Sequence, residues 1–243
     1  MSSKIGLNLT SFYSINFNSK KRNKKLIKFI IIHYTGMKKE SEAIKKLCNQ
    51  KSKVSSHYFI KNNGKVLNLV PDLYEAWHAG KSNWQKFKSL NRYSIGIEIN
   101  NPGHEYEYRK FSSKQVSSLI KLLKCLKKEY NINSKNILGH SDIAPNRKKD
   151  PGEKFPWKKL ADKNLSYWHK LKEIEIKKFR KVKINSKDKK IFLRNLYSIG
   201  YASINRAKPL SIVKAFQRRF RQKLVNGEID KECFLISKNL LKS

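Results

Sequence analysis

Two short apolar runs constrain the fold of this chain more than any other feature of its sequence. Residues 26–34 and 94–99 are rich in isoleucine, which is typical of β-strands buried inside a sheet. Residues 57–60 and 65–70 flank Asn62-Asn63-Gly64, a strong signal for a hairpin turn. Residues 136–138 form another short apolar segment that ends at Gly139. The chain is therefore expected to build a sheet from short strands.

Helical patterns alternate with these strands. A long helix is expected to begin near Ser112 or Ser113, because serine is a favourable helix cap. Its apolar side chains recur with a helical period, at Val116, Leu119, Ile120, Leu123, Leu126 and Tyr130. A shorter helix is expected over residues 41–48. Strands mixed with helices, some of them joined by a hairpin, predict an α/β fold with a mixed central sheet covered by helices.

The last third of the chain has a different pattern. Residues 170–190 are a charge-rich stretch, typical of a linker or a solvated helix. Three short helical segments follow, with apolar side chains at Leu193, Leu196 and Ile199, then at Val213, Phe216, Phe220 and Leu224, and then over residues 234–241. The predicted division is an N-terminal extension (1–25), an α/β domain (26–170), a charged linker (171–190) and a small three-helix domain (191–243).

Charge and cysteine content narrow the classes of protein. Lysine and arginine number 55 against 18 acidic residues, a formal charge of +37, which first suggests a nucleic-acid partner. The excess is spread along the chain, and no helix-turn-helix, zinc-finger or ribonucleoprotein motif accompanies it, so no specific nucleic-acid partner is expected. The three cysteines are an odd number and fit a reducing compartment or core packing better than a disulfide framework.

The N-terminal residues and the length of the apolar segments bear on the cellular compartment of the protein. Residues 1–25 contain no continuous apolar stretch of the kind found in signal peptides, and no segment is long enough to span a membrane. The expected compartment is the cytoplasm, and the alternative is the cell envelope, reached by an atypical export route. A monomer is the expected oligomeric state.

Three residues carry metal-binding chemistry at positions where sites form. His33 ends the first buried strand, His140 lies in Gly-His-Ser-Asp, and Asp150 follows ten residues later. Two imidazoles and one carboxylate are a common catalytic zinc set that leaves the fourth position for water. The spacing alone leaves open a structural histidine and an aspartate in a turn.

Five segments, in order, resemble one family. They are Ile-Ile-His-Tyr-Thr (31–35), Ser-His-Tyr-Phe-Ile (56–60), Ala-Trp-His-Ala-Gly (76–80), Ser-Ile-Gly-Ile-Glu-Ile (94–99) and Gly-His-Ser-Asp-Ile-Ala-Pro-Asn-Arg-Lys-Lys-Asp-Pro-Gly (139–152). The chain resembles, from about residue 26 to 160, the zinc amidases that include phage lysozyme-type amidases, peptidoglycan recognition proteins and bacterial N-acetylmuramoyl-L-alanine amidases. The resemblance implies zinc-dependent hydrolysis of the amide between N-acetylmuramic acid and L-alanine.

The resemblance also implies roles for single residues. His33, His140 and Asp150 match the metal ligands of one Zn²⁺ per chain. Some relatives have cysteine at the third position; the aspartate of this chain is a harder oxygen ligand, but it still suits zinc. Glu98 matches the acid–base residue, and Lys148 matches a lysine that stabilises the oxyanion of the tetrahedral intermediate. The basic neighbours of Lys148 leave open that it belongs to a solvated charge run.

Other side chains are assigned to the substrate side of the site. His78 is expected to contact substrate or to support a ligand, Trp77 to belong to the core or to form a platform for sugar or peptide, and Asn100 to line the groove. His57 is expected to be structural. His104 and His169 match no segment and are expected at the surface.

The C-terminal segment resembles a small helical peptidoglycan-binding domain. The matching pieces are Leu-Tyr-Ser-Ile-Gly-Tyr (196–201), Val-Lys-Ala-Phe-Gln-Arg-Arg-Phe (213–220) and Asn-Gly-Glu-Ile-Asp (226–230), and Cys233 departs from the threonine that many members have. Peptidoglycan or muropeptide fragments are therefore the expected partners. The alternative function is a protein of the same fold that binds peptidoglycan without cutting it. The sequence leaves open whether the substrate is intact wall or a released anhydro-muropeptide.

Overall fold

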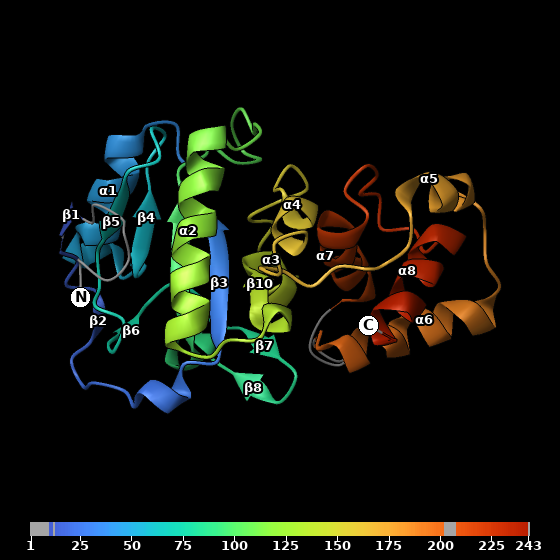
Figure 1. The fold of residues 1–243 in the computed structure, drawn as a ribbon, viewed down its shortest axis with the longest axis horizontal. Helices are drawn as coiled ribbons and strands as arrows, with labels where there is room; N and C mark the ends of the chain where they lie inside the picture. The colour runs from blue at the N-terminus through green and yellow to red at the C-terminus, as the bar shows by residue number, and fades with distance from the viewer. Residues whose placement is uncertain (1–9, 12, 202–207, 243) are drawn as a thin grey trace.

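A six-stranded mixed sheet forms the centre of the molecule in the computed structural model, which describes residues 10–11, 13–201 and 208–242. The strand order is β1 (Thr10–Ser11), β5 (Val66–Asn68), β4 (Tyr58–Ile60), β9 (Ser94–Ile99), β3 (Phe29–Tyr34) and β10 (Ile137–Gly139). β4 and β5 pair antiparallel as a hairpin, and the other neighbouring strands pair parallel. The predicted mixed α/β architecture is confirmed (Figure 1).

Short local elements join the strands. Gly64 closes the β4–β5 hairpin with a φ of 85°, a left-handed conformation that glycine adopts without a steric penalty. Two small antiparallel ribbons stand beside the sheet: β2 (Phe17–Asn18) with β6 (Glu75–Ala76), and β7 (Asn83–Trp84) with β8 (Phe87–Lys88). Single 3₁₀ turns are η2 (Lys24–Leu26), η3 (Gln50–Ser52), η4 (Leu90–Tyr93), η5 (Ser134–Asn136) and η6 (Lys177–Phe179). Residues 1–9 and 12 of the predicted N-terminal extension lie outside the described residues.

Helix α2 (Ser113–Glu129) covers one face of the sheet (Figure 1). Ser112 caps it in a reciprocal capping box with Gln115, so the predicted start is confirmed. The apolar stripe of α2 packs on Ile30 and Ile32 of β3 and on the isoleucines of β9. Helix α1 (Glu40–Cys48) forms a separate apolar cluster with β4 and β5 on the opposite side of the hairpin.

The C-terminal helices lie beyond β10 and pack against the short helix α3 (His140–Ile143). They are α5 (Glu173–Ile176), α6 (Ser186–Ile199), α7 (Pro209–Phe220) and α8 (Lys231–Leu241), and Figure 1 shows them on the β10 side of the sheet. Phe29 and Ile31 share one buried apolar cluster with these helices and with α3. Helix α4 (Trp157–Ala161) lies between α2 and α7 in the same view. The predicted helical segments are thus present, except that α7 ends at Phe220 and leaves Leu224 outside it, while the division into separate domains stays a prediction.

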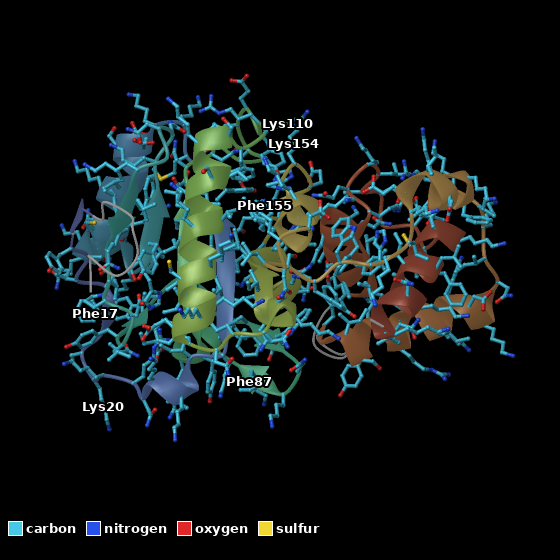
Figure 2. The ribbon with its side chains drawn as sticks, in the orientation of Figure 1. Phe17, Lys20, Phe87, Lys110, Lys154 and Phe155 are labelled. Carbon is cyan, nitrogen blue, oxygen red and sulfur yellow. The ribbon has the colours of Figure 1, made fainter. Side chains whose placement is uncertain are left out.

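Charged side chains surround the molecule rather than gathering on one face. Figure 2 shows nitrogen-tipped side chains round the outline of the molecule, with Lys20 at the lower left of the view and Lys110 and Lys154 near the top. None of the helices in the described part of the chain is long and apolar enough to cross a membrane.

Candidate metal centre

Three side chains converge at the carboxyl end of β3 and β10. These strands are adjacent and parallel, so His33 near the end of β3 and His140 just after β10 reach the same edge of the sheet. Asp150 joins them from the loop that follows α3, and its carbonyl accepts a hydrogen bond from Ser141 N at 2.8 Å. All three residues are buried. The structure therefore brings together the three residues that the resemblance picked out as ligands.

The facing atoms of the three side chains form a nearly equilateral triangle. His33 Nδ1 lies 2.9 Å from His140 Nδ1, and each of these nitrogens lies 3.1 Å from Asp150 Oδ2. Ligand atoms about 2.0–2.1 Å from a tetrahedral zinc ion stand roughly 3.3 Å apart, so the spacing fits one small cation. Two ring nitrogens and a carboxylate oxygen are also the donor types that zinc prefers.

A chain of buried hydrogen bonds fixes the tautomer of His33. Ser94 Oγ donates to the carbonyl of Leu90 at 2.6 Å, so it accepts from His78 Nε2 at 3.2 Å. The Nδ1 atom of His78 then carries no proton and accepts from His33 Nε2 at 3.0 Å. His33 Nδ1 is consequently left with a free lone pair that points at the triangle, which is the arrangement of a metal-binding histidine.

His140 is oriented in the same way by the backbone. Its Nε2 atom lies 3.2 Å from the carbonyl oxygen of Ala79, which can only accept a hydrogen bond. The donor-only guanidinium of Arg147 lies 3.3 Å from the same Nε2, so these contacts orient the ring with Nδ1 toward the triangle. Arg147 donates to the carbonyls of Ala79 and Lys81, so it braces the loop behind His140.

The protonation states suit metal binding near neutral pH. Burial, reinforced by the neighbouring His140, lowers the pKa of His33 to about 4, which leaves its ring neutral. Burial opposes ionisation of Asp150, but His140 and His33 outweigh it and hold the pKa of Asp150 below its ordinary value. A neutral imidazole and an ionised carboxylate are the forms that bind a metal ion.

Glu98 lies one strand away from His33. The two residues are register partners on β9 and β3, so their side chains lie on the same face of the sheet. Both line a cavity of about 350 Å³, and Glu98 Oε2 is buried without a hydrogen-bond partner among the described residues. Burial, followed by the charge of Asp150, raises the pKa of Glu98 to about 8, although Lys148 and Lys46 oppose the rise.

Gly96 makes room for this arrangement between Ser94 and Glu98. A Cβ atom on Gly96 would stand 2.4 Å from Cγ of His78, far inside contact distance. His78 therefore packs directly on the backbone of β9. Its hydrogen bonds favour the second of the two roles that the sequence left open, support of a ligand, although it also borders the cavity.

Lys148 and Trp77 also line the cavity, whereas Asn100 is not among the lining residues. The Trp77 indole donates a hydrogen bond to Asn18 Oδ1 at 3.0 Å. Its ring is partly exposed at the cavity wall. The Asn100 side chain is buried and bonded to Asn62 and Thr35. The roles of these three residues toward substrate stay predictions.

Sequence reasoning missed several groups around the cavity. Lys46 projects from α1 and lines it, but nothing distinguishes this lysine from its neighbours in the sequence. The surface assignment of His104 is wrong: it lines the cavity, and its ring contacts Tyr34 Oη at 2.8 Å and Glu153 at 2.9 Å. The surface assignment of His169 is also wrong, because this residue is only 5% exposed. His57 is fully buried, as expected of a structural residue.

Comparison with known proteins identifies the family. The model of the N-acetylmuramoyl-L-alanine amidase family matches residues 22–153. N-acetylmuramoyl-L-alanine amidase AmiD of Escherichia coli is 34% identical over 231 residues, which are 89% of this chain and 83% of AmiD. 1,6-Anhydro-N-acetylmuramyl-L-alanine amidase AmpD of Haemophilus influenzae is 38% identical over 108 residues, covering 44% of this chain and 56% of AmpD.

Solved structures give the same result over nearly the whole chain. E. coli AmiD, in complex with anhydro-N-acetylmuramic acid-L-Ala-D-γ-Glu-L-Lys, matches 93% of this chain and 91% of its own with a TM-score of 0.79 and 31% identity. AMPDH3 of Pseudomonas aeruginosa matches 94% of this chain and 98% of its own with a TM-score of 0.77 and 29% identity. The chain therefore belongs to the N-acetylmuramoyl-L-alanine amidases, enzymes that hydrolyse the amide bond between N-acetylmuramic acid and L-alanine.

Proposed function

We propose that this amidase acts on soluble muropeptides and holds one zinc ion between His33, His140 and Asp150. The observation that carries the proposal is the triangle of three converging ligand atoms. Three such atoms repel one another unless a cation lies between them. A zinc ion supplies Lewis acidity there, polarising a carbonyl oxygen and making water acidic enough to attack it at neutral pH.

Glu98 is the group that moves the proton. As water attacks the carbonyl carbon, a C–O bond forms and Glu98 accepts the proton that the water loses. When the C–N bond breaks, Glu98 returns this proton to the amine nitrogen of L-alanine. A pKa raised to about 8 keeps both protonation states accessible near neutral pH, which a residue that accepts and then donates a proton requires.

Lys148 stabilises the negative charge that develops on the carbonyl oxygen. Its side chain lines the same cavity as Glu98 and the three ligands, and an ammonium group in a partly enclosed cavity interacts strongly with an oxyanion. Lys46 and Arg147 extend this positive wall and suit a peptide stem that carries carboxylates. The solved complexes of AmiD and AMPDH3 with anhydromuramic peptides support muropeptides as the substrate class.

The decisive experiment measures metal content and hydrolysis on one preparation of the full-length protein. We expect about one zinc ion per chain, loss of muropeptide hydrolysis on chelation, and recovery on adding zinc. Glu98→Gln should retain zinc and lose at least about 100-fold in turnover. A protein that contains no zinc and hydrolyses muropeptides unaffected by the chelator would contradict the metal assignment.

Substrate choice is tested on the same preparation. Anhydro-muropeptides and intact sacculi should be digested side by side, with the new N-terminal alanine measured in both. Faster release from the soluble substrate supports the proposal, and release from sacculi alone contradicts it.

A further inference from the structure

The C-terminal helices reach the metal centre through one buried carboxylate. Asp142 lies two residues after the ligand His140 and is almost completely buried. Its Oδ2 atom accepts hydrogen bonds from Gly139 N at 2.8 Å and from Arg219 at 2.6 Å, and its Oδ1 atom accepts from the Tyr201 hydroxyl at 2.8 Å. Arg219 and Tyr201, two of the three donors, thus belong to the C-terminal part of the chain.

Arg219, on α7, joins three elements around the ligands. One guanidinium nitrogen donates to Asp142, and another donates to the carbonyl of Ile137 on β10 at 3.0 Å. The guanidinium also lies over the ring of Trp157, 4.4 Å from its centre, at the start of α4. The ion pair is buried on both sides, so removal of the arginine leaves an uncompensated charge in the interior.

Two further contacts from the C-terminal part fix the rest of the ligand loop. Gln222 donates to the carbonyls of Glu153 and Phe155 at 2.7 and 2.6 Å, just beyond Asp150. The backbone N–H of Lys208 donates to Asn146 Oδ1 at 3.0 Å. The segment from residue 139 to 155, which contains two of the three proposed ligands, is therefore held at three places from outside the α/β part.

We propose that Arg219 is a positioning residue of the metal centre: through Asp142 it fixes the start of α3 and thereby the ring of His140. The C-terminal helices then contribute to metal affinity, in addition to any role in binding the cell wall. The inference rests on the proposed zinc site. Residues that orient metal ligands from outside typically change metal affinity by about 10–100-fold when they are replaced.

The test compares two buried ion pairs of the C-terminal helices. Arg219→Met removes the pair with Asp142. The matched control, Arg221→Met, removes the equally buried pair with Asp230. The other hydrogen bonds of the Arg221 side chain, to Asn226 and Glu228, stay within the C-terminal part. Zinc dissociation constants of the full-length proteins are measured by competition with a chelator, at a temperature where near-ultraviolet circular dichroism shows each variant folded.

We expect Arg219→Met to weaken zinc binding by at least about 10-fold, and Arg221→Met to leave it within a factor of about 2. Arg219→Lys, which keeps the charge but loses the forked geometry, should recover part of the affinity. Equal zinc binding by wild type and Arg219→Met would overturn the proposal. Equal weakening by both methionine variants would overturn it as well, because general destabilisation then explains the loss.

A milder variant covers the case in which Arg219→Met does not fold. Tyr201→Phe removes a single hydrogen bond to Asp142 and keeps the ring, so zinc binding should weaken by several-fold while the protein stays folded. Unchanged zinc binding in this variant would then overturn the proposal.

Hydrogen exchange separates this inference from the metal assignment. In metal-free protein, amides of residues 139–150 should exchange faster in Tyr201→Phe than in wild type, and no faster in Arg221→Met. A wild type that binds no zinc refutes the proposed function. Unchanged exchange in Tyr201→Phe refutes the positioning role, whether or not zinc binds.

Discussion

Glu98 should destabilise the metal-free protein in proportion to its ionisation. Its pKa is raised from 4.5 to about 8, chiefly by burial, so the folded state holds a proton that the unfolded chain has lost. Because the folded-state pKa is the higher one, the stabilising contribution is complete below pH 4.5 and is lost as the pH rises through 8. Glu98→Gln stays neutral throughout and should escape this loss.

The size of the effect follows from the shift. Each pKa unit corresponds to about 1.4 kcal/mol, so the shift from 4.5 to about 8 sets an upper limit of about 5 kcal/mol. The Glu98 side chain is only partly buried where it borders the cavity, and solvent screening there reduces the cost. We therefore expect metal-free Glu98→Gln to be more stable than metal-free wild type by about 2–3 kcal/mol at pH 8.5, and nearly equal to it at pH 4.5.

Urea unfolding with excess chelator measures this difference at pH 4.5, 7 and 8.5. Both proteins contain His33, whose lowered pKa changes stability in the opposite direction, so the difference between the two at each pH isolates Glu98. Glu107→Gln, on an exposed loop, serves as the surface control. A stability difference that is independent of pH, or a less stable Glu98→Gln at pH 8.5, would refute the reasoning.

Three further changes have outcomes set by the packing. His78→Phe removes the acceptor for His33 Nε2 and should weaken zinc binding by about 10–100-fold in a chelator competition. Gly96→Ala forces its methyl group against the His78 ring and should lower the free energy of unfolding by about 1–3 kcal/mol in urea. Ending the chain at Asn185 removes α6, α7 and α8 from the apolar cluster around α3 and leaves Asp142 without two donors, so cooperative thermal unfolding should be lost.

Features that depend on neighbouring residues were predictable from the sequence. The β3 and β9 runs are apolar enough to be recognised without any partner, and the serine cap of α2 is a local signal. The convergence of His33, His140 and Asp150 followed from resemblance, since their spacing alone left structural roles open. The parallel pairing of β3 with β10 explains why residues 107 positions apart meet.

Features that depend on which surface packs against which were not predictable. His104 and His169 carry no local signal, and their positions depend on residues far away in the sequence: Tyr34 and Glu153 contact His104, and the backbone of Phe220 contacts His169. The same holds for the pair between Asp142 and Arg219. With 55 basic residues in the chain, no pattern indicates which arginine loses contact with water.

The apolar run of β3 nevertheless contained a clue about the C-terminal helices. Alternate side chains of a strand point to opposite faces, so a run that is apolar at every position needs cover on both faces. Helix α2 covers Ile30 and Ile32, while on the other face Phe87 contacts Phe29 and the short helix α3 packs against β3. A charged segment at 171–190 indicates contact with solvent there, yet it does not show that the helices after it fold apart from the sheet. Because α3 is short, the apolar cluster that it shares with Phe29 and Ile31 continues into α6, α7 and α8, so the C-terminal helices share a core with the sheet.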